Sequence, residues 1–113
     1  MKIDWAYMRK GWTSCKKAWE AFTDAKIDIA EEIDAKKDVI GKNDVWAVLR
    51  KAENVYVASG QKTIRYKPDS TNKEELINKA TGRTGNLRAP TLCSGENLYV
   101  GFNVSMYEGL MSR

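Results

Sequence analysis

The segment that decides the fold is GWTSCKK, residues 11–17. It lies between a short apolar stretch, residues 3–8, and a helical pattern that we expect over residues 14–26. A strand that passes directly into a helix brings unpaired backbone N–H groups and the positive end of the helix to one point. Cys15 falls in the first helical turn, next to two lysines. Such surroundings favour the thiolate, so this segment predicts redox chemistry on sulfur.

The same cysteine has a second interpretation, as a residue of the core. Cys15, Ala18, Trp19 and Phe22 follow the spacing i, i+3, i+4, i+7, which places them on one apolar stripe of the helix. Free cysteines are among the most buried residue types and often behave as small hydrophobic side chains. The sequence therefore leaves open whether Cys15 is a reactive thiol or a packing residue.

The composition limits the number of domains and the kinds of function that this chain can have. A chain of 113 residues is long enough for one core, so we expect a single domain over residues 1–113. Histidine is absent and the two cysteines are far apart in the sequence, which argues against a metal centre and a Cys-His nucleophile. The net charge is +4, but 15 acidic residues are interspersed with 19 basic ones, so we expect no binding to nucleic acid.

The location of the protein is predicted from what the sequence lacks. No apolar run approaches the roughly 18 residues that a membrane-spanning helix needs. The beginning of the chain also lacks the uninterrupted apolar core of a secretory signal. We therefore expect a cytoplasmic protein that does not enter a membrane.

The first half of the chain predicts a βαβ unit. Residues 2–7 and 27–34 have the alternation of strands and flank the first helix, so the two strands should be parallel. Asn43 is a candidate N-cap for a second helix that ends near residue 52. Residues 55–58 and 63–66, on either side of a Ser-Gly turn, predict a β-hairpin.

The second half predicts a helix, a second hairpin and a final helix. Thr71 and Glu74 have the spacing of a capping box at a helix start. A tight turn then separates residues 91–93 from 98–100, which we expect to pair as a central hairpin. The last helix should cover residues 104–111, with Asn103 as its cap.

Three short segments carry a resemblance to a known family. They are TSCKKA at residues 13–18, RAPTL at residues 88–92 and YVGFN at residues 99–103. In this order they resemble the ArsC/Spx branch of the thioredoxin-like superfamily: the second half of its Cys-x-x-Cys-Lys/Arg-Lys-Ala signature, its Arg-Pro strand start and its Val-Gly-Phe/Tyr-Asn segment. The resemblance implies an α/β fold of the thioredoxin-like (glutaredoxin/ArsC-like) type, with a mixed sheet and helices on both faces. It also implies a cis Ala89–Pro90 bond against residues 12–15.

This chain differs from the family pattern at residues that the branch uses for arsenate reduction. Trp12 stands where the branch has its first, nucleophilic cysteine, so Cys15 matches the second, resolving position. Arsenate reductases of the branch hold the oxyanion with arginines, and Ala89 and Gly101 stand at two of those places. A third aligns near Ser59, and Arg88 is shifted by one residue, which should turn it to the other face of its strand. The resemblance therefore does not imply a true arsenate reductase.

Two functions remain, and the first is a weak thiol–disulfide oxidoreductase. Cys15 would be its single catalytic thiol, and we expect no cofactor, with glutathione as a candidate co-substrate drawn by the basic residues around the motif. The expected substrate-binding residues are Trp12, Thr13, Ser14, Lys16, Arg88, Ala89 and Pro90.

The second function is a redox-inactive binding module of the same fold. A small thiol or a protein partner would then bind the face formed by Trp12, Cys15 and Pro90. Cys93 lies on a strand that we expect to be central, so it should be a packing residue. A Cys15–Cys93 disulfide also stays open, because the sequence does not give the Cα separation of about 5.5 Å that it requires.

Overall fold

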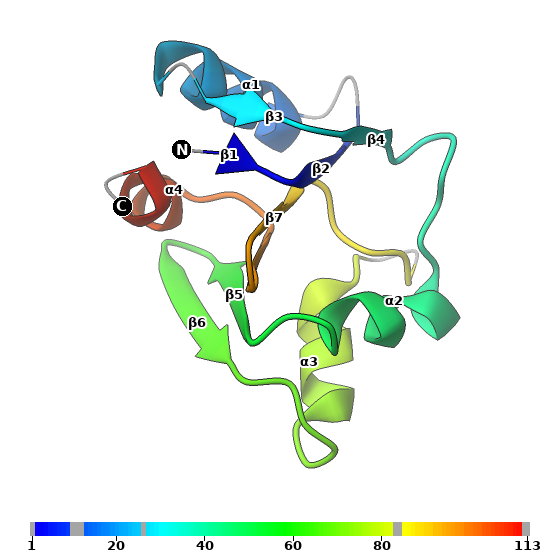
Figure 1. Ribbon diagram of the computed structural model, residues 1–113. Coiled ribbons are helices and arrows are strands. Elements are labelled where there is room, and N and C mark those ends of the chain that lie inside the picture. The colour runs from blue at the N-terminus through cyan, green and yellow to red at the C-terminus, as the bar shows by residue number, and fades with distance from the viewer. Residues whose placement is uncertain (1, 10–12, 26, 83–84, 112–113) are drawn as a thin grey trace.

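The structure is a computed structural model that describes residues 2–9, 13–25, 27–82 and 85–111 (Figure 1). In chain order its elements are β1 (Lys2–Ile3), β2 (Trp5–Met8), α1 (Thr13–Ala25), β3 (Asp28–Ile29), β4 (Glu32–Asp34), α2 (Lys42–Leu49), β5 (Asn54–Ser59), β6 (Lys62–Tyr66), α3 (Lys73–Ala80), β7 (Thr91–Ser94), β8 (Asn97–Val100) and α4 (Val104–Met111). One mixed sheet has the strand order β4-β2-β7-β8-β5-β6, and β1 pairs with β3.

The predicted parallel pair is present, but both strands are interrupted. β1 runs parallel to β3 and β2 runs parallel to β4 in one continuous register. The interruption falls at Asp4, whose amide donates to the carbonyl of Cys93 and whose carboxylate accepts from the amide of Gly95, at 2.8 and 2.7 Å. Asp4 is thus bound to the hairpin on the other side of β2. The expectation of two uninterrupted strands was wrong, and that of a parallel pair is confirmed.

Both predicted hairpins are confirmed, and they belong to the same sheet. β7 lies between β2 and β8 and is antiparallel to both, so it is a central strand. β5 and β6 pair as an antiparallel hairpin across Gly60, whose φ of 61° suits a tight turn. β5 then pairs in parallel with β8, beginning at Asn54 opposite Asn97. This long-range pairing extends the sheet to six strands.

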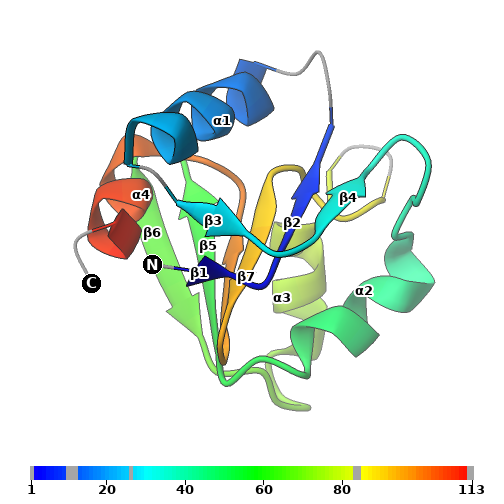
Figure 2. The same cartoon turned by 45° about the horizontal axis from the view of Figure 1, so that its top comes forward.

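The helices cover both faces of the sheet. α1 and α4 lie on one side of it, and α2 and α3 lie on the other (Figures 1 and 2). On α1 the predicted apolar stripe is turned inward, with Cys15, Ala18 and Phe22 buried and Trp19 at its margin with 37% of its surface exposed. The structure therefore shows a mixed α/β architecture with the expected layers.

The ends of α2 and α4 test two predicted caps. The N-cap of α2 is Gly41, not Asn43, and no side chain bonds to that helix end. The helix ends at Leu49, before the predicted end near residue 52, and the amide of Glu53 then bonds the carbonyl of Glu96 where the chain enters β5. The cap of α4 is confirmed, since the Asn103 side chain accepts from the amide of Met106 at 2.7 Å.

The predicted capping box of α3 was wrong. The residue before the helix is Asn72, so Thr71 lies too early to cap it. Asp69 instead accepts hydrogen bonds from the amides of Thr71 and Asn72, and Asn72 returns one by accepting from the amide of Asp69. The side chains of Asp69 and Asn72 close the turn before the helix, in place of the expected contact between Thr71 and Glu74.

Candidate functional site

The predicted site lies where β2 ends, α1 begins and the chain enters β7. Tyr7 on β2 pairs with Thr91 on β7, and this antiparallel register brings Pro90 to the level of Met8 and Ala89 to that of Arg9. The Ala89–Pro90 bond is cis, as the resemblance implied. The amide of Arg9 donates to Sγ of Cys15 at 3.3 Å. The thiol and the cis-proline therefore lie at the same end of β2.

Cys15 occupies this position as a buried thiol. Only 2% of its surface is exposed. Burial raises its pKa above the ordinary value, and the amide and the positive charge of Arg9 offset only part of that effect. The expectation that the helix start would make this thiol acidic was wrong, because removal from water outweighs the favourable charges.

The other residues predicted around the thiol differ in their exposure to solvent. Thr13 and Lys16 are in the first turn of α1, and both are exposed to solvent. Ser14 is in the same turn, with only its backbone described, and Trp12 lies outside the described residues. Ala89 and Pro90 are buried.

The side chain of Arg88 is held by hydrogen bonds within the protein. Its Nη1 donates to the carbonyls of Ala58 and Lys79, at 3.0 and 3.3 Å, and so links β5 to α3. Burial lowers its pKa, and within the described part of the chain no carboxylate pairs with it. A Cβ atom at Gly101 would lie 2.6 Å from Nη2. The guanidinium therefore packs directly over Gly101.

Cys93 is placed too far away to act with Cys15. It pairs with Trp5, at the other end of β2 from Arg9, which is about 13 Å along a strand. That distance exceeds the reach of a disulfide, and both cysteines are free. Cys93 is half-buried, and burial together with the carboxylate of Asp4 raises its pKa. The disulfide left open by the sequence is not formed.

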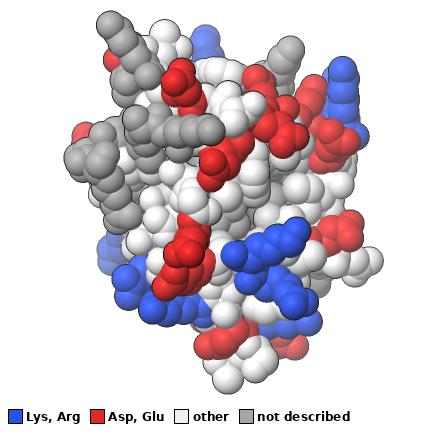
Figure 3. All heavy atoms as spheres, viewed as in Figure 1, with Lys and Arg blue, Asp and Glu red and all other residues white. Residues whose placement is uncertain are grey.

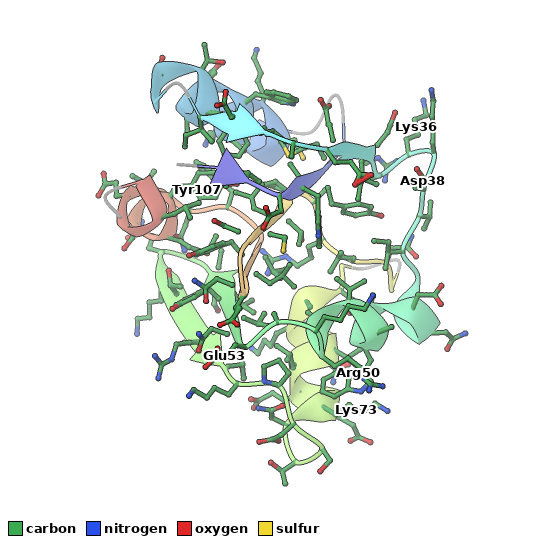
Figure 4. The ribbon with its side chains drawn as sticks, in the orientation of Figure 1. Lys36, Asp38, Arg50, Glu53, Lys73 and Tyr107 are labelled. Atoms are coloured by element: carbon green, nitrogen blue, oxygen red, sulfur yellow. The ribbon has the colours of Figure 1, made fainter. Side chains whose placement is uncertain are left out.

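A cavity of about 330 Å³ is lined in part by Arg9, the residue whose amide contacts Cys15, and no feature of the sequence predicted it. The described residues that line it are Tyr7, Arg9, Ala35, Lys36, Val39, Gly82, Asn86, Leu87, Arg88 and Ala89. They come from the end of β2 and from the connections β4–α2 and α3–β7. Figure 4 shows Lys36 on the first of these connections. Because two of the three walls are loops, no periodic pattern in the sequence pointed to the cavity.

A buried phenol was also missed. Tyr107 comes from α4 and lies between α4 and α1, with its ring stacked on Phe22 at 5.9 Å and edge-on to Phe102 at 4.5 Å (Figure 4). Its hydroxyl is fully buried and has no hydrogen-bond partner in the described part of the chain. Burial, and then the neighbouring Cys15, raise its pKa far above the ordinary value. In the sequence, Tyr107 falls within the expected last helix, residues 104–111, and nothing in that pattern indicates a buried hydroxyl.

The rest of the surface and the comparisons with known proteins say little about the function of this chain. Acidic and basic groups lie next to one another on the face drawn in Figure 3. Among the described residues, no cluster of three His, Cys, Asp or Glu side chains could hold a metal ion, and no helix is long and apolar enough to cross a membrane. No protein-family model matches the chain, and neither does any curated protein.

Proposed function

We propose that this chain is a thioredoxin-like protein, similar to the ArsC/Spx branch, that works as a redox-inactive binding module. The topology supports the fold: β4, β2, β7 and β8 form a mixed four-strand core with a helix between its first two strands and another after its last. A cis-proline before β7, at the same end of β2 as the thiol, supports the branch. The β5–β6 hairpin is then an addition to that core.

The burial of Cys15 is the observation that argues against thiol exchange. Exchange requires an accessible thiolate, and this thiol is 2% exposed with its pKa raised by burial. Cys93, the other cysteine, is half-buried with a raised pKa and lies at the opposite end of β2. A protein partner or small thiol would then bind without a covalent bond over the predicted face of Trp12, Cys15 and Pro90, where Cys15 and Pro90 are buried and Thr13 and Lys16 are exposed.

A second candidate, the weak one-thiol oxidoreductase, is favoured by a specific contact. The amide of Arg9 donates to Sγ of Cys15, and the charge of Arg9 also lowers the pKa of this thiol. Both interactions would stabilise a thiolate if the site opened. That thiolate would attack one sulfur of a disulfide such as oxidised glutathione, forming a mixed disulfide and releasing the other sulfur as a thiolate.

The rate of alkylation by iodoacetamide against pH separates the two functions. For a binding module, we expect Cys15 to react only after unfolding, so wild type and Cys15→Ser should alkylate alike while folded. An oxidoreductase would show a fast phase with an apparent pKa below the free-thiol value of about 8.5, and Cys15→Ser would lose it. The matched control is Cys93→Ser, which should keep any fast phase that belongs to Cys15.

The Trp12→Cys variant gives a companion measurement. It restores the Cys-x-x-Cys spacing that the branch uses. If the site is a redox scaffold without its nucleophile, this variant should reduce a small disulfide in the presence of glutathione while wild type does not. Measurable turnover by the wild-type protein would contradict the binding-module proposal.

A further inference from the structure

The cavity beside β2 has the size and construction of a small-molecule site. Its volume of about 330 Å³ falls at the lower end of the range for ligand pockets, roughly 300–1,000 Å³. Its walls come from three segments far apart in the sequence: the end of β2, the connection after β4 and the connection before β7. Neither Cys15 nor Pro90 is among the described residues that line it, so it is distinct from the thiol.

The charges that line the cavity have one sign. Arg9, Lys36 and Arg88 are the only described lining residues with a full charge at neutral pH, and all three are cations. Two carboxylates flank this part of the lining along the chain, those of Asp34 and Asp38, and Asp34 accepts a hydrogen bond from the amide of Lys36 at 2.9 Å. The Lys36 side chain is exposed. Three cations in the lining of one cavity would attract an anion.

The rest of the lining is largely apolar. Ala35, Val39, Leu87 and Ala89 contribute to it, and Val39 is one of the large apolar side chains that the fold leaves exposed, at 54%. The hydroxyl oxygen of Tyr7 accepts a hydrogen bond from the amide of Ile40 at 3.0 Å. An inorganic anion would leave these apolar walls uncovered, whereas an anion with an apolar body would cover them.

We propose that the cavity binds a small organic carboxylate, with Lys36 facing the carboxylate and the apolar walls covering the body, while Arg9 contributes positive charge to the lining. This goes beyond the proposed function, because it involves neither a protein partner nor the thiol and holds whether or not Cys15 reacts. Arg88 adds positive potential while its guanidinium stays bound to the carbonyls of Ala58 and Lys79.

The test is a titration of the folded, full-length protein with benzoate, followed by the amide signals in two-dimensional NMR spectra. We expect saturable shifts centred on Ala35, Val39, Leu87 and Ala89 below about 20 mM benzoate, as befits a small fragment. Lys36→Gln should raise the dissociation constant about fivefold, which is the effect of one partly exposed charge. The matched control is Lys37→Gln, the same change in the next residue, which is exposed and does not line the cavity.

Neutral and inorganic probes complete the test. Benzamide, which has the shape of benzoate without its charge, should bind at least tenfold more weakly, and inorganic phosphate should not match benzoate. The proposal is overturned if benzoate shifts none of these amides by about 20 mM, or if benzamide binds equally well. Equal effects of Lys36→Gln and Lys37→Gln, or shifts with phosphate alone, would overturn it too. Because none of these readouts involves sulfur, their failure leaves the alkylation result unaffected.

Discussion

Two buried tyrosines show that different kinds of contact hold the elements packed on the two faces of the sheet. Tyr7 is 1% exposed, and its hydroxyl accepts a hydrogen bond from the amide of Ile40, just before α2. Tyr107 is 3% exposed, and its hydroxyl lacks a partner among the described residues. The connection to α2 therefore depends on a directed polar bond. The contact between α1 and α4 depends on rings packed against rings.

Arg88 extends the same contrast. It binds a carbonyl of β5 and a carbonyl of α3, so a guanidinium ties the sheet to the helix on the side where α2 and α3 lie. Directed bonds fix the distance between the groups they join, whereas stacked rings tolerate small shifts. We therefore expect the α2–α3 side to respond more strongly to small substitutions, and three predictions test this.

The largest effect should come from Gly101→Ala. Gly101 has a φ of 82°, and its new Cβ would lie 2.6 Å from Nη2 of Arg88 and 3.3 Å from Cβ of Ala58. Arg88 would have to give up its bonds to the two carbonyls in addition to the backbone strain. We expect a loss of about 2–4 kcal/mol in the free energy of unfolding, measured with urea.

The control for this prediction is Gly60→Ala. Gly60 also has a positive φ, 61°, but a Cβ there would meet nothing within 4 Å. It should therefore show the backbone cost alone, about 1 kcal/mol. If the two variants lose the same free energy, the contact between Arg88 and Gly101 contributes nothing, and the contrast between the faces loses one of its supports.

The second prediction compares Tyr7→Phe with Tyr107→Phe. Removing the hydroxyl of Tyr7 leaves the amide of Ile40 without its partner, so the free energy of unfolding should fall by about 1–2 kcal/mol. Removing the hydroxyl of Tyr107 eliminates a buried group that has no partner, so that variant should be unchanged or more stable by up to about 1 kcal/mol. Urea unfolding at pH 7 measures both. A larger loss in Tyr107→Phe would reverse the comparison.

Much of the fold was predictable, because its signals are local. The two hairpins follow from short runs of β-branched and aromatic residues around tight turns. The cap of α4 follows from the position of Asn103. The parallel pairing of β2 with β4 follows from the order strand, helix, strand, which leaves little other choice. The cis bond at Pro90 came from the resemblance alone.

The features that could not be predicted depend on long-range contacts. Asp4 interrupts the first strand because it binds Gly95, a residue at the far end of the chain. The parallel pairing of β5 with β8 joins segments that no local pattern connects. For the site, the sequence pointed to the helix start and its two lysines, whereas the charge that lowers the pKa of Cys15 is that of Arg9 at the end of β2, and the burial that raises this pKa is set by the elements packed over the thiol. The cavity is likewise made by loops that meet only in the folded chain.

The smallest effect is a pH dependence that belongs to Cys15, on the side of α1 and α4. The pKa of this thiol is higher in the folded protein than in the unfolded chain, where it is about 8.5. The unfolded chain therefore loses this proton first, so the contribution is fully present below pH 8.5 and is lost as the pH rises toward the folded pKa. The free energy of unfolding of wild type should therefore fall as the pH rises above about 8.5, by at most about 1.4 kcal/mol per pH unit for this one group.

Cys15→Ala isolates this dependence. The variant is less stable at every pH because it leaves a small gap in the core, but its free energy of unfolding should decline less steeply with pH than that of wild type. Cys93→Ala is the comparison, since Cys93 also has a raised pKa but is only half-buried, and its removal should flatten the profile less. Urea unfolding at half-unit steps of pH gives the slopes. If Cys15→Ala keeps the full wild-type slope, the thiol is open to water, and the side of α1 and α4 is not the dry, ring-packed region that the comparison requires.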